Sequence, residues 1–184
     1  ATSSGTLQFL PLCSGLLLVG LFAHVFVHSI SDLRGEFKVR GGTDNWATFV
    51  PVFRCTLGFV LLYYIFLFFQ SWTKFHMHTK SATTSHGPSL TAVKYGQAGG
   101  KLGLTGDRTV GNMMEQAIPF VLALWLYAWV VDVQHGAILG WCWLVARAAY
   151  PFVFYRGIPF LLLSTVPGYL ILFYMYYAIG AKIL

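Results

Sequence analysis

Charged residues are scarce in this sequence. Asp, Glu, Lys and Arg together make up 10% of its 184 residues, whereas a soluble domain carries about 25%. Hydrophobic residues make up 57%, and the mean hydropathy is +0.65. This composition excludes a soluble globular domain. We therefore expect an integral membrane protein, with the lipid bilayer as its main surroundings.

Cysteines and alternating patterns are also nearly absent. The three cysteines, Cys13, Cys55 and Cys142, lie in separate apolar segments without a CxxC motif, so neither a disulfide framework nor a zinc site is indicated. The apolar runs do not alternate with polar residues as barrel strands do. Several of them approach the roughly 20 residues that a helix needs to cross about 30 Å of hydrocarbon. The expected fold class is all-α, a polytopic membrane protein. The first run lacks the flanks of a signal peptide and is expected to be a retained helix.

Five membrane-spanning helices are expected, over about residues 10–30, 46–72, 112–131, 137–155 and 158–179. In "YRGIPF", Gly157 and Pro159 separate the last two, because both residue types stop helices. The turn there is so short that these two helices should be antiparallel neighbours. We expect two parts: residues 1–45, with the first helix and a polar loop, and residues 46–184, with the other four helices.

The segment Thr73–Gly111 is expected to be a long polar loop. With five spans it lies on the same side of the membrane as the N-terminus and Arg156. That side carries six loop cations and the opposite side four, so the positive-inside rule places the basic side in the cytosol, or in the matrix or stroma of an organelle. "YGQAGGKLGLTG" is not a phosphate-binding loop, since a Walker A motif needs glycine at Tyr95 and Ser or Thr at Leu102.

Polar residues open the third span, in "DRTVGNMMEQAIPF". Arg108, Asn112 and Glu115 lie four and seven residues apart and therefore share one helical stripe. On the fourth span, which returns to the same side, Arg147 and Tyr150 share another stripe. At about 1.5 Å per residue, Glu115 and Arg147 reach a similar depth. Two interpretations are open: an internal ion pair between them, or a pocket for an anionic ligand, since two arginines outnumber one carboxylate.

The same motifs resemble the MAPEG superfamily, membrane-associated proteins in eicosanoid and glutathione metabolism. The shared pattern is Arg-x3-Asn-x2-Glu with a nearby proline, followed on the next helix by Ala-Arg-x2-Tyr. The resemblance implies that residues 46–184 form the family's four-helix bundle and that the first helix is an addition. It also implies a homotrimer that binds glutathione between subunits, near the cytosolic face of the endoplasmic reticulum or of an organelle membrane.

The resemblance further implies roles for individual side chains. Glutathione would be contacted by Arg108, Asn112, Glu115, Arg147, Tyr150 and Tyr155. Catalysis would involve Arg147, Tyr150 and Arg156. The reaction would be transfer of glutathione to a lipophilic electrophile, or reduction of a lipid hydroperoxide, with the glutathione thiolate as the nucleophile. Neither a metal nor a nucleic acid is expected as a partner.

The sequence also departs from the family pattern, at Val110, Gln116 and Phe154. Catalytic members carry an arginine near the start of the last helix that activates the thiol, but Ile158–Leu163 is wholly apolar. Only Arg156 lies close, and Lys74 is a weak substitute. Without an activating cation the thiol stays mostly protonated at neutral pH. Two functions therefore remain: a glutathione-dependent transferase or peroxidase, or a non-catalytic accessory subunit of a larger membrane complex.

His24 and His28 lie four residues apart in the first span. Such a pair could bind a haem or a metal. No other span contains a histidine to complete the coordination, so hydrogen bonding between helices is the favoured interpretation.

Overall fold

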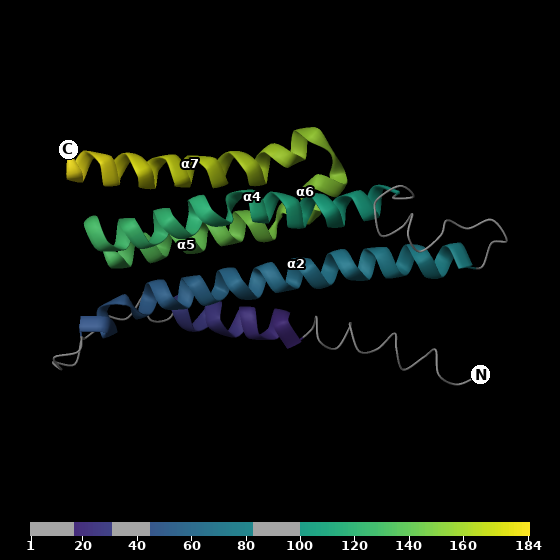
Figure 1. Cartoon of the computed structure of the whole chain (residues 1–184), viewed down its shortest axis with the longest axis horizontal. Coiled ribbons are helices and arrows are strands. Elements are labelled where there is room, and N and C mark those ends of the chain that lie inside the picture. The colour runs from purple at the N-terminus through teal and green to yellow at the C-terminus, as the bar shows by residue number, and fades with distance from the viewer. Residues whose placement is uncertain (1–16, 31–44, 83–99) are drawn as a thin grey trace.

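The computed structural model describes residues 17–30, 45–82 and 100–184 (Figure 1). These residues are almost entirely helical, and no strand occurs among them. The elements are a helix Leu17–Ile30, the 3-10 helix η1 Asn45–Phe49, α2 Val50–Ala82, α4 Lys101–Val130, α5 Val133–Ala148, α6 Tyr150–Arg156 and α7 Ile158–Ile183. The predicted all-α class is confirmed.

Four helical segments are long and apolar enough to cross a membrane: Ala47–Thr79, Lys101–Val130, Val133–Arg156 and Ile158–Ile183. The protein is therefore an integral membrane protein. The helix Leu17–Ile30 is apolar but shorter than these four. The first part of the span expected over residues 10–30 lies outside the described residues.

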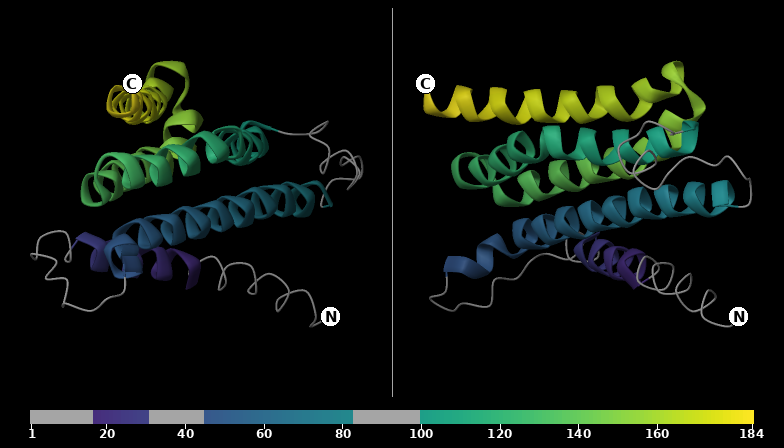
Figure 2. Two further views of the ribbon diagram at one scale, coloured as in Figure 1. Left: turned by 60° about the vertical axis from the view of Figure 1, so that its left-hand side comes forward. Right: turned by 45° about the vertical axis from the view of Figure 1, so that its right-hand side comes forward.

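The helices α2, α4, α5 and α7 form an antiparallel bundle. Both α4 and α5 pack against α2 on one side and against α7 on the other (Figures 1 and 2). The helix Leu17–Ile30 lies along the far side of α2 (Figure 1). Its Phe26 ring meets the Trp141 ring of α5, with centroids 5.2 Å apart. In the middle of the bundle Phe120 of α4 stacks on Trp143 of α5 at 3.9 Å.

Glycines allow α2 and α5 to approach closely. A Cβ atom on Gly58 would lie 2.5 Å from the Trp141 ring, and a Cβ atom on Gly140 would lie 2.5 Å from Cys55 Sγ. Such small residues are the usual means of close helix packing in membranes, where burial of apolar surface does not drive association. Cys55 is fully buried at this contact, where it acts as a small packing side chain.

The predicted loop Thr73–Gly111 is wrong at both ends, because α2 continues to Ala82 and α4 begins at Lys101. Polar contacts join these helix ends. Gln70 Nε2 donates to Asp107 Oδ1 at 2.7 Å, and Lys74 Nζ lies 2.9 Å from the same oxygen. At residues 73–82 and 101–111, the polar composition therefore belongs to the ends of two helices.

The fourth span is interrupted, although a continuous helix was predicted over residues 137–155. The break lies at Ala149, between α5 and α6. Pro151 explains it, because proline has no N–H for the carbonyl of Arg147 and its ring clashes with that carbonyl. The predicted stop at Gly157 is confirmed: its φ of 120° is a conformation that favours glycine.

Candidate functional site

The guanidinium of Arg147 is the most deeply buried charge among the described residues. The residue lies in the last turn of α5 and is 1% exposed. Its Nη2 donates to Gln116 Oε1 at 2.5 Å, and its Nη1 donates to Asn112 Oδ1. The guanidinium carbon lies 5.1 Å from the centroid of the Trp143 ring. Arg147 therefore links α5 to α4.

Arg147 and its partners Asn112 and Gln116 form a polar centre, and α7 is the third helix that packs against it. A Cβ atom on Gly168 would lie only 2.3 Å from Arg147 Nη2, so the guanidinium rests directly on the backbone of α7. The ring of Tyr169 lies 6.0 Å away. Nearby, Ser164 Oγ donates to the carbonyl of Ala146 at 2.6 Å. Three helices thus meet around one arginine.

The predicted ion pair between Glu115 and Arg147 is not formed. Glu115 is exposed on the outside of the bundle, whereas Gln116 is 3% exposed and accepts from Arg147. In the sequence, Gln116 stands out only as a departure from the family pattern. Gln116 lies four residues after Asn112 and Glu115 lies three, so helical spacing allows either residue on the face towards α5.

Arg147 is held by neutral acceptors. Within the described ranges, 17–30, 45–82 and 100–184, no carboxylate forms an ion pair with it. The buried Nε of Arg147 and Nε2 of Gln116 also have no acceptor among these residues. A buried guanidinium without a paired carboxylate is costly, so Arg147 depends for its stabilisation on these neutral acceptors and on the Trp143 ring.

The stripe on α4 lies at hydrocarbon depth. The helix has 30 residues and spans about 45 Å, against about 30 Å of hydrocarbon. Any window of about 20 residues in it includes residues 111–120, and thus Asn112, Glu115 and Gln116. Arg108, also exposed, lies about two turns nearer the helix start. Since exposed Glu115 is costly against lipid, something should cover it.

Tyr150 lies behind this stripe. It is 5% exposed and lies near Arg108, Arg147 and Glu115. The five polar residues that the sequence grouped together are thus brought to one region, but in two layers. Arg147 and Tyr150 form the buried layer, Arg108 and Glu115 form the exposed one, and half-buried Asn112 connects them.

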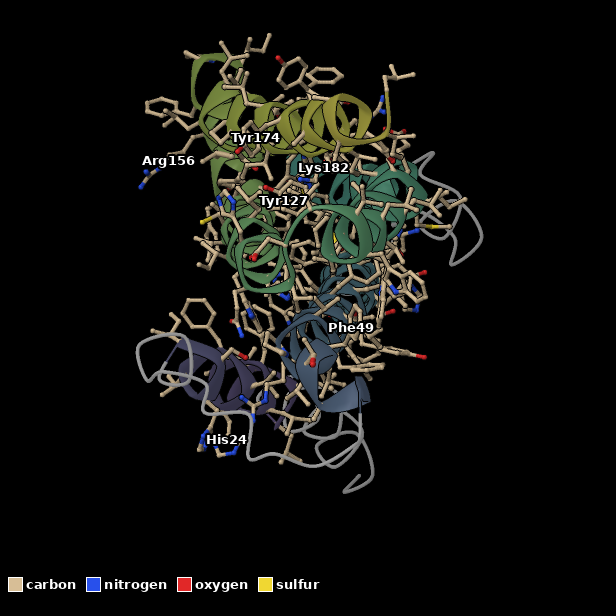
Figure 3. All side chains as sticks on the ribbon, turned by 90° about the vertical axis from the view of Figure 1, so that its left-hand side faces the viewer. His24, Phe49, Tyr127, Arg156, Tyr174 and Lys182 are labelled. Carbon is tan, nitrogen blue, oxygen red and sulfur yellow. The ribbon has the colours of Figure 1, made fainter. Side chains whose placement is uncertain are left out.

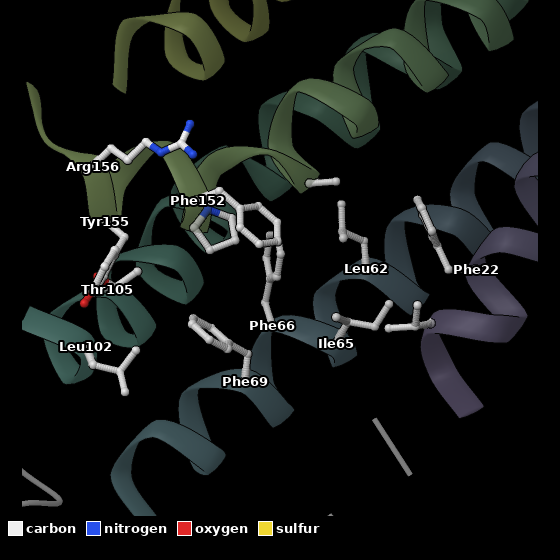
Figure 4. Close-up of a pocket in the computed structure, with 13 residues that line it drawn as sticks. Phe22, Leu62, Ile65, Phe66, Phe69, Leu102, Thr105, Phe152, Tyr155 and Arg156 are labelled. Atoms are coloured by element: carbon white, nitrogen blue, oxygen red, sulfur yellow. The ribbon is translucent and has the colours of Figure 1, made fainter. Parts of the chain in front are cut away.

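Tyr155 and Arg156 lie elsewhere. They line a cavity of about 820 Å³ between α2, α4, the end of α5, α6 and the helix Leu17–Ile30 (Figure 4). It is lined by none of the five polar residues of the two stripes, Arg108, Asn112, Glu115, Arg147 and Tyr150. Over the Tyr155 ring, Lys101 Nζ lies 4.8 Å from the centroid. The residues predicted to share one glutathione site therefore divide between two places.

The other candidate residues have separate surroundings. Lys74 is paired with Asp107, and exposed Ile158 begins α7. The His24 and His28 rings lie 4.4 Å apart, and His24 points away from the bundle (Figure 3). No group of three or more metal-binding side chains occurs in the described part of the chain.

The architecture is that of a helical membrane protein with four spanning segments and a polar centre shared by three of them. The sequence model of the MAPEG family matches residues 52–181. This match covers most of the chain and includes most of each of the four spanning segments, so the protein belongs to the MAPEG family. No curated protein and no solved structure is similar enough to count as a match.

Proposed function

We propose that this MAPEG protein binds glutathione along the exposed stripe of α4, formed by Arg108, Asn112 and Glu115. The observation that supports this most directly is the exposed carboxylate of Glu115 at hydrocarbon depth, which needs a partner. Glutathione carries two carboxylates, an ammonium and amide donors. Arg108 suits a carboxylate, and Glu115 suits the ammonium or an amide.

In this proposal Arg147 acts as a positioning residue. It is too deeply buried to touch a ligand on the stripe, but it holds the Asn112 amide and adds positive potential behind the site. Tyr150 acts in the same buried layer. Tyr155 and Arg156 do not contact glutathione bound to the stripe of their own subunit, because they line the separate cavity.

A second copy of the chain would cover the stripe. Towards the C-terminal end of α4, the same exposed face continues after Glu115 with large side chains at helical spacing: Ile118 (71% exposed), Leu122 (51%) and Trp129 (75%). A neighbouring subunit on this face would enclose the ligand, in keeping with a homotrimer. We place the protein in an endoplasmic reticulum or organelle membrane, with the connection between α2 and α4 on the cytosolic, matrix or stromal side.

Calorimetry with glutathione and the detergent-solubilised protein tests the proposal. The wild type should bind, and Arg108→Ala should weaken binding about tenfold or more, since it removes a charge-assisted hydrogen bond. Lys182→Ala, at the far end of α7, is the matched control and should bind normally. No binding to the wild type would leave the stripe as a purely structural feature.

The alternative function is a non-catalytic subunit of a larger membrane complex. It is favoured by the surroundings of the residues that could activate the thiol. Lys74 forms an ion pair with Asp107, and Arg156 lines the cavity beside α6 and not the α4 stripe. The segment Ile158–Leu163 carries no cation. Conjugation of glutathione to a reactive aromatic halide distinguishes the two functions. Turnover that Arg147→Ala abolishes supports the enzyme, whereas binding without turnover, with stable co-purification of other membrane subunits, supports the accessory role.

A further inference from the structure

The cavity beside α6 is lined mainly by apolar side chains, which come from five helices. Phe66 and Phe69 come from α2, Phe152 from α6, and Phe22 from the helix Leu17–Ile30 (Figure 4). Its volume of about 820 Å³ falls in the range of about 300–1,000 Å³ that is typical of small-molecule sites. The size and lining of this cavity suit an aliphatic chain.

Positive charge gathers at one end of this cavity. Arg156 ends α6 and lines the cavity, and Lys101 begins α4 and lies over the ring of Tyr155. Among the residues that the structure describes, no carboxylate pairs with either cation. Both residues lie at the ends of spanning helices, on the same side of the bundle (Figure 1). This is the level at which lipid headgroups are found.

We propose that the cavity holds one acyl chain of an anionic phospholipid, whose phosphate binds Arg156. Basic pockets between membrane helices recognise anionic headgroups in this way. Lys101 supplies a second cation near the phosphate. The proposal is independent of glutathione binding, since no residue of the α4 stripe lines the cavity.

A bilayer phospholipid fits the site better than a water-soluble ligand. Phe152, at the cavity, is 73% exposed, so the cavity opens towards the surrounding hydrocarbon. A lipid can enter sideways with one chain and leave its second chain in the bilayer. In this proposal the helix Leu17–Ile30 helps to hold the lipid, because its Val19 and Phe22 form part of the cavity wall.

Lipid retention tests this proposal. The full chain is reconstituted in nanodiscs of equal parts phosphatidylcholine and phosphatidylglycerol, extracted in mild detergent, and its bound lipid is identified by native mass spectrometry. The wild type should retain phosphatidylglycerol preferentially. Arg156→Gln should reduce that preference about fivefold, the effect of one basic residue near the headgroups. Lys182→Gln makes the same charge change at the opposite end of the bundle and should retain the wild-type preference.

A cavity-filling variant tests the chain site separately. Ile65→Trp should displace both phospholipids, while circular dichroism checks that the helices remain. Equal retention of the two phospholipids by the wild type would overturn the proposal, as would an Arg156→Gln variant with unchanged preference. In a parallel sample with added oleate, retention of oleate without phospholipid would show that the occupant is wrong.

Discussion

The surroundings of Arg147 show how one side chain can join three membrane helices. Its donors reach Asn112 and Gln116 on α4, and its guanidinium rests against Gly168 on α7. A planar group with five donors is suited to such a junction. Because the centre is closely packed, small changes around it should have measurable effects.

Gly168→Ala should destabilise the protein. The added Cβ atom would lie 2.3 Å from Arg147 Nη2, so the guanidinium must move and its bond to Gln116 is lost. The expected cost is about 1–3 kcal/mol, from overpacking and a broken buried hydrogen bond. Thermal unfolding of the detergent-solubilised protein measures it. Gly180→Ala, where nothing lies within 4 Å, is the control and should not lower the unfolding temperature.

Gln116→Leu should lower stability by about 1–3 kcal/mol, because it removes the acceptor of Arg147 Nη2 and leaves a buried donor unpaired. Chemical unfolding in detergent gives the value. Met114→Leu on the exposed side of the same helix should be nearly neutral. A neutral Gln116→Leu would mean that Arg147 does not depend on this bond.

For single residues, the sequence predicted where the polar side chains lie better than it predicted the hydrogen-bond partners of Arg147. Helical spacing correctly put Arg108, Asn112 and Glu115 on one side of α4, and put Arg147 at a matching depth. Spacing alone could not decide whether Glu115 or Gln116 faces α5, since adjacent residues differ by only about 100° around a helix. Charge complementarity favoured Glu115, but Gln116 is the buried acceptor.

The elements were predictable where hydropathy defines them. The apolar runs correctly located four spanning helices, and Gly157 with Pro159 located the last turn. Hydropathy cannot follow a helix beyond the bilayer, so it predicts a loop where the ends of α2 and α4 continue. The break at Ala149 could have been inferred from Pro151, which removes a backbone hydrogen bond.

Asp107→Asn should have a small effect. It removes the ion pair with Lys74 but keeps an oxygen that can accept from Gln70. Since the paired side chains are 26% and 33% exposed, the expected loss is below about 1 kcal/mol. Hydrogen exchange of the amides in residues 101–107 should rise modestly. A global loss of stability would show instead that this pair anchors the bundle.

For the whole molecule, the exposed face of α4 matters most. If a second subunit or a ligand covers Glu115, Glu115→Leu should weaken glutathione binding and shift the oligomer towards monomer in native mass spectrometry. If Glu115 faces lipid, the same change should raise the unfolding temperature and leave the oligomer unaffected. Ile118→Leu, three residues further on the same face, is the control that should change neither property.

Pro119, inside α4, has a consequence for the polarity of that face. Proline has no N–H, so the carbonyl oxygen of Glu115 lacks its helical donor. Glu115 therefore offers two acceptors, its backbone carbonyl oxygen and its side-chain carboxylate. Arg108, about 10 Å further along the axis, presents only donors. A molecule that lies along the helix therefore meets a positive charge at one end and a negative charge at the other. A ligand or a neighbouring chain that covers this face would therefore match it best with an anionic group near Arg108 and a donor or cationic group near Glu115.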